Sequence, residues 1–239
     1  MPFRAVLLDF FNTLTRAVRR GPRHAEIARS LGCDPQTWVE VLDRTYAARS
    51  RGSYGSAEDG LRRVAHEAGG NPSDAEISAA VLARIVAVRE DAILRDEVGS
   101  MLGTLRRMGL RTAVVSDCWF EVPVFLPRLA IAPLINAYVF SVDVGAAKPH
   151  PSMYLTACDR LGVRPRDCLY VGDGGSLELS GARRLGMTAV RLDAPDLGTH
   201  LTFNADRDWT GPVLDSLDAV APFSEGARLR HAGYAGTLV

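Results

Sequence analysis

The sequence predicts an α/β fold that combines a doubly wound parallel sheet with a smaller helical domain. The first observation is a set of apolar runs of strand length, each ending in small or acidic residues. Because these runs are continuous rather than alternating, they indicate strands buried on both faces, as in a parallel sheet. The expected strands are Ala5–Phe11, Thr112–Ser116, Ala137–Val142, Cys168–Gly172 and Thr188–Leu192.

The second observation is that a helix-like stretch comes shortly before three of the later strands. These stretches are Asp96–Met108, Ser152–Leu161 and Glu178–Leu185, and a glycine follows each of them directly. Glycine just past the end of a helix is the expected stop signal. Strands that alternate with such helices predict βαβ units in a doubly wound sheet.

The third observation is the long gap between the first two strands. Gly21-Pro22 and Asp34-Pro35 resemble helix starts, and Ala57–Ala68 and Asp74–Val88 carry apolar residues at helical spacing. The gap is too long for a simple crossover, so it predicts a small helical domain. We expect a sheet domain from residues 1–14 and 96–224, a helical domain from 15–95, a last short strand and helix within Trp209–Val220, and a loose C-terminal tail from 225–239.

Composition narrows the class of protein. Lys and Arg together equal Asp and Glu, so the formal net charge is zero and a nucleic-acid partner is not expected. No apolar run is long enough to predict a membrane span or a signal peptide. The four cysteines are scattered and form no C-x-x-C pair. Reduced thiols in a cytoplasmic protein explain them better than disulfides or a zinc site.

Reactive side chains follow four of the expected strands. Asp9 lies near the end of the first, Ser116 closes the second, Lys148 lies in the loop after the third, and Asp173 directly follows the fourth. In an open parallel sheet the active site lies at the carboxyl ends of the strands. Two carboxylates, a hydroxyl and an ammonium group are therefore expected to converge there, a combination suited to phosphoryl chemistry.

These residues, in this order, resemble the four motifs of the haloacid dehalogenase-like (HAD) hydrolase superfamily over about residues 3 to 220. The motifs are an Asp-initiated loop with Thr13-Leu14, a strand-end Ser, Lys148 followed by Pro149, and Gly172-Asp173. The resemblance implies a Rossmann-like core. It also implies that the helical segment 15–95 is a cap domain of the type inserted after the first strand.

The resemblance implies a role for each matched residue. Asp9 would be the nucleophile, attacking phosphorus or carbon and forming a covalent intermediate. Ser116 would donate a hydrogen bond to a transferring phosphoryl oxygen, and Lys148 would neutralise its charge. Considered alone, Asp9 and Ser116 also suit turn capping, and Lys148 also suits an exposed surface position. The expected substrate-binding set is Phe11, Asn12, Thr13, Ser116, Asp117, Lys148 and Arg16, with Thr13 fixing the loop geometry.

The resemblance also implies Mg²⁺ as cofactor. Its expected ligands are Asp9, Asp173 and the backbone carbonyl of Phe11, since this ion prefers oxygen ligands and keeps several waters. The ion would shield Asp9 from an incoming phosphate dianion. Glu178 matches the family's second acidic position only approximately. It would either orient a metal-bound water or lie idle on its helix.

Phe11 departs from the phosphatase pattern, which places a second Asp there to transfer protons. General acid–base help of this kind is worth about 10²–10⁴ in rate. Dehalogenases of the family carry an aromatic residue there, but they need no Mg²⁺ and lack the Gly-Asp that stands here at Gly172-Asp173. Three hypotheses therefore remain open: a Mg²⁺-dependent phosphatase of a small phosphorylated metabolite, which Asp173 favours; a metal-independent 2-haloacid dehalogenase; and a non-catalytic binding or regulatory protein.

The helical domain is expected to select the small-molecule substrate. A basic cluster near its start would be either a solvated linker or an anion-binding surface: Arg16, Arg19, Arg20, Arg23 and His24. Trp38, Tyr46 and Tyr54 would line an apolar pocket or form helix core. The chain is expected to be a monomer or a homodimer.

Overall fold

A six-stranded parallel sheet forms the centre of the computed structural model, which describes residues 3–199 and 202–233, with Thr199 and the last seven residues described by their backbone alone. The strand order is β3-β2-β1-β4-β5-β6, which is the doubly wound order with a topological switch point between β1 and β4. The strands are β1 (Ala5–Leu8), β2 (Arg111–Ser116), β3 (Ala137–Phe140), β4 (Cys168–Gly172), β5 (Thr188–Leu192) and β6 (Val213–Leu214).

Helices cover both faces of the sheet, and the alternation of β1 shows why its sequence is apolar throughout. Val6 and Leu8 pack towards α5 (Val98–Arg107), α6 (Glu121–Phe125) and the start of α10 (Val220–Gly233). Ala5 and Leu7 pack on the other face, towards α8 (Pro151–Leu161) and α9 (Glu178–Arg184). Side chains on both faces of the strand are removed from water, as in other parallel sheets. A short helix, α7 (Ser141–Val144), directly follows β3.

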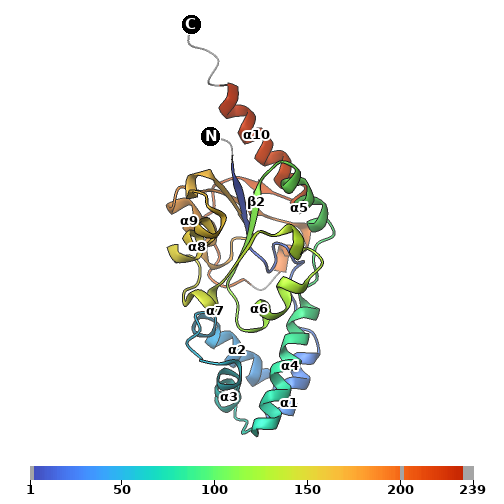
Figure 1. The fold of residues 1–239 in the computed structure, drawn as a ribbon. Coiled ribbons are helices and arrows are strands. Elements are labelled where there is room, and N and C mark those ends of the chain that lie inside the picture. Colours follow the sequence, from blue (N-terminus) through green and yellow to red (C-terminus); the bar gives the residue numbers. More distant parts are fainter. Residues whose placement is uncertain (1–2, 200–201, 234–239) are drawn as a thin grey trace.

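Four helices form a separate layer beyond the carboxyl ends of the strands (Figure 1). They are α1 (Arg23–Ser30), α2 (Pro35–Arg49), α3 (Ala57–Glu67) and α4 (Asp74–Asp91). They share a core that contains Trp38, Leu61 and Ile77. Polar residues begin three of these helices: the side chains of Asp34, Ser56 and Ser73 accept hydrogen bonds from backbone N–H groups in the first turns of α2, α3 and α4.

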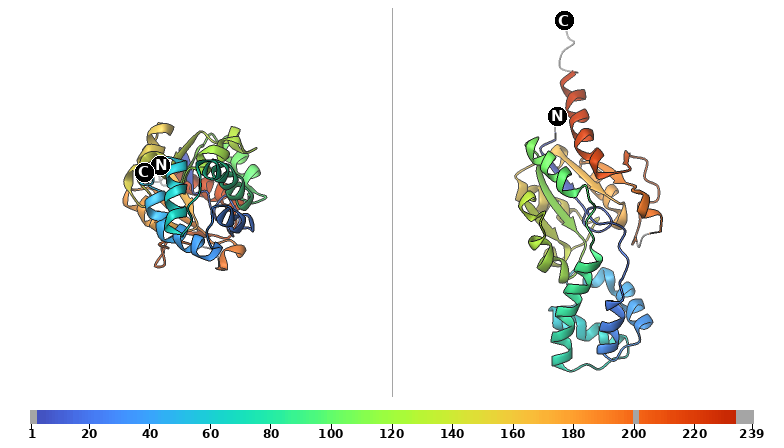
Figure 2. Two further views of the ribbon diagram at one scale, coloured as in Figure 1. Left: turned by 90° about the horizontal axis from the view of Figure 1, so that it is seen from below. Right: turned by 90° about the vertical axis from the view of Figure 1, so that its right-hand side faces the viewer.

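Two adjacent linkers join the helical layer to the sheet. Thr15 and Leu94 form an antiparallel bridge, and the N–H of Arg95 donates to the carbonyl of Leu14 at 3.0 Å. The chain therefore leaves and re-enters the sheet domain beside the loop that follows β1. Figure 2 shows the helical layer at one end of the molecule and α10 extending from the opposite end.

The structure confirms the predicted α/β class and parallel sheet, with some different boundaries. β1 ends at Leu8 rather than at Phe11, because its paired register stops there and the chain turns into a loop. β3 ends at Phe140 rather than at Val142, because α7 begins at Ser141. The loose tail predicted from residue 225 is wrong as far as Gly233, since α10 continues to that residue; residues 234–239 lie outside the described part of the chain. Within the described residues, no helix has both the length and the apolar character needed to cross a membrane.

Candidate active site

A cavity of about 690 Å³ lies between the carboxyl ends of the strands and the helical layer. This volume falls in the range typical of small-molecule sites. The loops after β1, β2 and β4 line it from the sheet side with Asp9, Asp117 and Asp173, and Lys148 joins them from the loop between α7 and α8. Helices α1, α2 and α4 line the other side.

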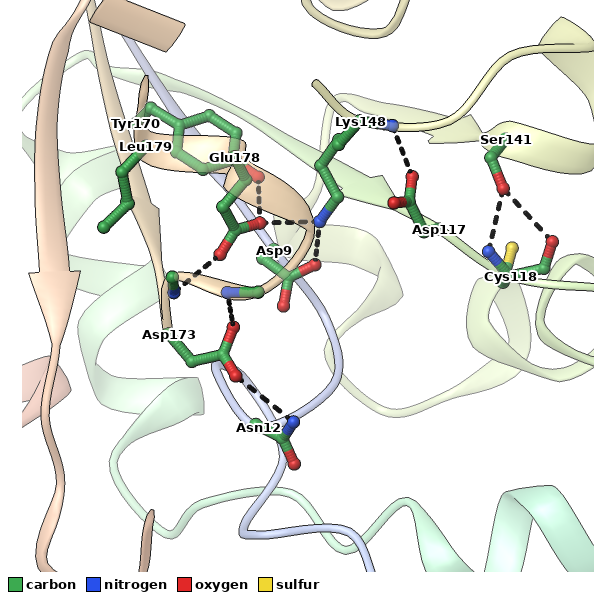
Figure 3. A network of polar contacts seen from close by, with 12 residues as sticks. Asp9, Asn12, Asp117, Cys118, Ser141, Lys148, Tyr170, Asp173, Glu178 and Leu179 are labelled. Atoms are coloured by element: carbon green, nitrogen blue, oxygen red, sulfur yellow. Dashed lines mark hydrogen bonds and ion pairs between the residues drawn. The ribbon is translucent and has the colours of Figure 1, made fainter. Parts of the chain in front are cut away.

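Lys148 bridges two buried carboxylates, and all three side chains line this cavity; Figure 3 shows the bridge. Its Nζ donates to Oδ1 of Asp9 at 2.5 Å and to Oε2 of Glu178 at 2.6 Å. The Tyr170 hydroxyl also donates to Oε2 of Glu178 at 2.6 Å, and the N–H of Gly174 donates to Oε1 at 3.1 Å. Glu178 is fully buried. It therefore does not lie idle on its helix face, as one of the two sequence readings expected, but anchors Lys148 beside Asp9.

Asp173 lies on the other side of Asp9 and is fixed by the loops around it. The Asn12 side-chain amide donates to Oδ2 of Asp173 at 3.2 Å, and the N–H of Gly175 donates to Oδ1 at 3.0 Å. Asn12 has a left-handed backbone with φ of 61°, a conformation that asparagine tolerates better than most residues. Carboxylate oxygens of Asp9, Asp173 and Glu178 all lie within 4.8 Å of one another. The loop geometry thus brings three acidic groups to one point.

Burial dominates the electrostatics of this cluster. It raises the pKa of Asp9 from 3.8 to about 6; Lys148 opposes this change and Asp173 adds to it. Burial also raises the pKa of Glu178 well above its usual value, again against the charge of Lys148. Burial alone would lower the pKa of Lys148, but the charges of Asp9 and Glu178 outweigh it and raise that pKa. The lysine is therefore a fixed cation surrounded by carboxylates that are costly to ionise.

Backbone carbonyls of the loop after β1 are held in different ways. The Arg95 side chain donates from Nε to the carbonyl of Thr13 and from Nη2 to that of Asn12, both at 3.0 Å. Its Nη1 pairs with Asp196 at 2.7 Å. In contrast, the carbonyl of Phe11 accepts no hydrogen bond from the described residues. Arg95 thus fixes the loop through two of its carbonyls, and the carbonyl of Phe11 stays available to a ligand.

The other candidate residues from the sequence are spread over several environments. Asp117 lines the cavity, accepts a hydrogen bond from the N–H of Lys148 at 2.9 Å, and has its pKa raised by burial. Phe11 also lines the cavity. The hydroxyls of Thr13 and Ser116 are buried and have no hydrogen-bond partner within residues 3–198 and 202–226. Arg16 is exposed, pairs with Asp96 and does not line this cavity, which argues against its predicted role in substrate binding.

The basic cluster at the start of the helical layer divides into two parts. Arg19, Arg20 and His24 line the cavity, whereas Arg23 is exposed and pairs with Glu90. The three aromatic residues divide similarly. Tyr46 lines the cavity and stacks on Phe203 at 4.4 Å, whereas Trp38 and Tyr54 lie in the helical core.

Several cavity-lining residues were not found from the sequence. Arg49 follows Leu42 and Tyr46 at helical spacing, and all three line the cavity from α2, so this spacing was a usable signal. Trp119 follows the end of β2 and packs into the helical core. Phe203 lies in an irregular segment, where no periodic pattern points to a contact with α2.

The fold and this cavity define a hydrolase class in which a carboxylate on the first strand-end loop faces a lysine and further acidic groups. The chain belongs to the haloacid dehalogenase-like hydrolase family, whose family model matches residues 3–186. This membership confirms the family resemblance seen in the sequence.

Curated relatives of the chain include phosphatases that match over short segments. Glyceraldehyde 3-phosphate phosphatase from Methanopyrus kandleri is 38% identical over 89 residues, which are 37% of this chain and 38% of that protein. Phosphoglycolate phosphatase from Xylella fastidiosa is 40% identical over 101 residues, which are 40% of this chain and 42% of that protein. The matched segments thus span about two-fifths of each relative.

Solved structures match over nearly the whole chain at lower identity. The 2-haloacid dehalogenase from Pseudomonas syringae pv. Tomato DC3000 has a TM-score of 0.68 and 21% identity, over 94% of this chain and 99% of that chain. A HAD family enzyme from Bacteroides thetaiotaomicron in complex with magnesium and inorganic phosphate has a TM-score of 0.60 and 18% identity, over 87% of this chain and 98% of that chain. At such identities these likenesses establish the shared fold.

Proposed function

We propose that this protein is a Mg²⁺-dependent phosphohydrolase of a small phosphorylated metabolite, with Asp9 as nucleophile. One observation carries the proposal: three buried carboxylates lie within 4.8 Å of one another, and a lysine pairs with two of them, Asp9 and Glu178. Such a group is costly to bury unless a further cation balances it. The phosphatase relatives and the magnesium and phosphate bound to a protein of the same fold support the same reading.

The residues present fit a magnesium ion. Asp9 and Asp173 would hold it together with the carbonyl of Phe11, which accepts no hydrogen bond from the described residues. Both oxygens of Glu178 already accept hydrogen bonds, so Glu178 serves better as the anchor of Lys148 than as a ligand. Oxygen-only ligation with few protein groups is what Mg²⁺ prefers. When bound, the ion would supply charge neutralisation between Asp9 and a phosphate dianion.

In the proposed reaction, a carboxylate oxygen of Asp9 attacks phosphorus. The new bond joins Asp9 to the phosphoryl group, and the bond between phosphorus and the ester oxygen breaks. Lys148 keeps Asp9 ionised and oriented through its 2.5 Å contact and offers positive charge to the phosphoryl oxygens. The hydroxyl of Ser116, which has no hydrogen-bond partner among the described residues, would donate to one of these oxygens. Water then hydrolyses the aspartyl phosphate, releasing inorganic phosphate and restoring the carboxylate.

Phe11 decides which leaving groups suit this site. It lines the cavity beside Asp9, but a phenyl ring has no proton to give to a departing alkoxide. The proposal therefore favours esters whose alcohol leaves without protonation. Aryl phosphates with acidic phenols are the matching laboratory substrates.

Hydrolysis of an activated aryl phosphate tests the proposal. Wild-type protein with Mg²⁺ should release phosphate, EDTA should abolish the release, and added Mg²⁺ should restore it. Asp9→Asn should be inactive. Asp96→Asn removes an exposed carboxylate outside the cavity and is the matched control. Turnover that survives chelation, or turnover that survives the loss of Asp9, would contradict the proposal.

Phe11 also favours a second candidate function, metal-independent displacement of halide from a 2-halo acid. A halide leaves without a proton, so an aromatic residue at this position costs that reaction nothing. Release of chloride or bromide from a panel of 2-halo acids in EDTA would support it. Blank results across the panel, together with Mg²⁺-dependent phosphate release, would remove it.

A further inference from the structure

The arginines that line the cavity are not equally paired. Among the described residues there are four, and three of them are explained by their surroundings. Arg20 forms an ion pair with Asp43, and Arg84 forms one with Glu121. Arg19 is exposed to solvent. The fourth, Arg49, is only 5% exposed, and none of the described acidic side chains lies within ion-pair distance of it.

The Arg49 side chain is nevertheless held firmly in place. Its Nε donates to the Thr45 hydroxyl at 3.0 Å, and Nη2 donates to the carbonyl of Leu42 at 2.7 Å. The guanidinium carbon lies 4.5 Å from the ring centroid of Trp119. Nη1 has no hydrogen-bond partner among the described residues. It is also not fully buried. The guanidinium is thus held in place with donor capacity left over, in a residue that lines the cavity.

An uncompensated buried cation is costly, which makes Arg49 unusual. Burial lowers the pKa of Arg49 to about 10, with a further contribution from the charge of Arg84. The side chain therefore still carries its charge at neutral pH. Glu121 favours that charge from a distance, but its own ion pair is with Arg84. The missing counter-ion is expected to arrive with a ligand.

The charges around the cavity divide into two groups. Acidic side chains gather where the strands end, at Asp9, Asp117, Asp173 and Glu178 around the single Lys148. Arginines gather on the other side, on the helical layer and the linker into it, where the acidic residues Asp91 and Glu121 are already paired with His24 and Arg84. Tyr46 connects the two groups: its hydroxyl donates to the carbonyl of Asp117 at 3.3 Å, and Arg49 lies one helical turn further along α2. Both groups line the same cavity of about 690 Å³, so one small molecule bound there can contact both of them.

We propose that Arg49 binds a second anionic group of the substrate, a carboxylate or a phosphate. The proposal rests on the proposed function for the reacting phosphoryl group at Asp9 and defines the substrate class as a phosphate ester that carries another oxyanion. Arginine suits this role because its planar fork matches carboxylate and phosphate oxygens. Leu42 and Val88 line the same cavity and suit a short carbon chain between the two anionic groups.

Three aryl phosphates of one skeleton separate the possibilities, because Phe11 has no proton for a departing alkoxide and a phenolate leaves without one. They are the phenyl phosphate ester of 4-hydroxyphenylacetic acid, its neutral primary amide, and the bisphosphate of 4-(2-hydroxyethyl)phenol. The ratio of kcat/KM for each anionic ester to that for the amide is measured in the presence of Mg²⁺. Wild type should favour one anionic ester by about 10- to 100-fold, the range expected for hydrogen bonds to a charged group. The preferred ester tells carboxylate from phosphate.

Variants of one helix identify the residue responsible. Arg49→Met should reduce the ratio to near one, and Arg49→Lys should reduce it several-fold because a point charge replaces the fork. Arg44→Met is the matched control: Arg44 is an exposed residue of α2 that pairs with Glu67 outside the cavity, and its ratio should equal that of wild type. Thermal unfolding checks that each variant is folded, and Arg49→Lys decides the test if Arg49→Met does not fold.

Two results would overturn the inference: a wild-type ratio near one for both anionic esters, or a ratio that is unchanged in the Arg49 variants. Failure of the proposed function looks different, because wild type would then turn over none of the three esters. In that case the same ratios are measured as dissociation constants by calorimetry with Mg²⁺ present. Tighter binding of an anionic ester that depends on Arg49 would still support the site, and equal binding of all three would refute it.

Discussion

Asp9→Asn is expected to stabilise the metal-free protein more at pH 7.5 than at pH 4.5. Burial raises the pKa of Asp9 from 3.8 to about 6, so the folded protein binds this proton more tightly than the unfolded chain does. The contribution of this proton to the free energy of unfolding is therefore fully present below about pH 3.8 and is lost as the pH rises through 6. Each pKa unit is worth about 1.4 kcal/mol, which gives a total of about 3 kcal/mol. About 2 kcal/mol of this falls between pH 4.5 and 7.5.

Urea unfolding in EDTA measures the effect. The free energy of unfolding is determined for wild type and Asp9→Asn at both pH values, and the difference between the two proteins is compared. That difference should move in favour of the variant by about 2 kcal/mol at the higher pH. Asp96→Asn, which removes a largely exposed carboxylate, is the control. A difference that stays constant with pH would refute the reasoning, since burial of the Asp9 carboxylate would then carry no cost.

The remaining predictions concern the loop after β1, the helical layer and the metal. Phe11→Asp should raise kcat/KM for unactivated alkyl phosphates by about 10²–10⁴, measured over esters of graded leaving-group acidity; an unchanged dependence on leaving group would contradict it. Arg95→Met should lower the free energy of unfolding by about 2–4 kcal/mol in urea, because two loop carbonyls and a carboxylate lose their donor. Gly60→Ala should lower the free energy of unfolding by about 1–3 kcal/mol, since the added Cβ would lie 2.5 Å from Cζ2 of Trp119. Gly103→Ala is the control, because its Cβ would come no closer than 3.5 Å to a neighbour, and equal melting temperatures for the two variants would argue against the Trp119 contact. Mg²⁺ at 100 times its dissociation constant should raise wild-type stability by about 2.7 kcal/mol, an effect that Asp9→Asn should weaken.

Much of the sheet could be predicted because its signal is local. Buried parallel strands are continuous apolar runs, and Cys168–Gly172 and Thr188–Leu192 were found with the boundaries that the structure shows. The strand at Ala5 was predicted too long, because Phe10 and Phe11 are apolar yet pack from a loop. Composition does not distinguish these two ways of burying an aromatic ring.

The reactive end of the site was also accessible from the sequence, because its residues follow directly after strands. Asp9, Lys148 and Asp173 meet as expected from the rule for parallel sheets. The role of Glu178 was not accessible. The hydroxyl of Tyr170 and the N–H of Gly174 hold its carboxylate against Lys148. These hydrogen bonds cannot be predicted from the position of Glu178 on a helix.

The other side of the cavity depends on tertiary packing that the sequence does not display. Arg49 stands out because it is buried and no acidic side chain of the described residues pairs with it. The sequence contains no pattern from which the lack of a counter-ion could be predicted. Phe203 reaches Tyr46 from a segment more than 150 residues away in the chain. Contacts of this kind are set by how the helical layer sits on the sheet.

Chemical trapping of the intermediate tests the central claim most directly. Wild-type protein with Mg²⁺ and an activated aryl phosphate is quenched in acid, reduced with borohydride, digested and analysed by mass spectrometry. An aspartyl phosphate is reduced to homoserine, so we expect homoserine at position 9 and unmodified aspartate at position 173. Phosphate release without any reduction of Asp9, or reduction at a different carboxylate, would contradict the account.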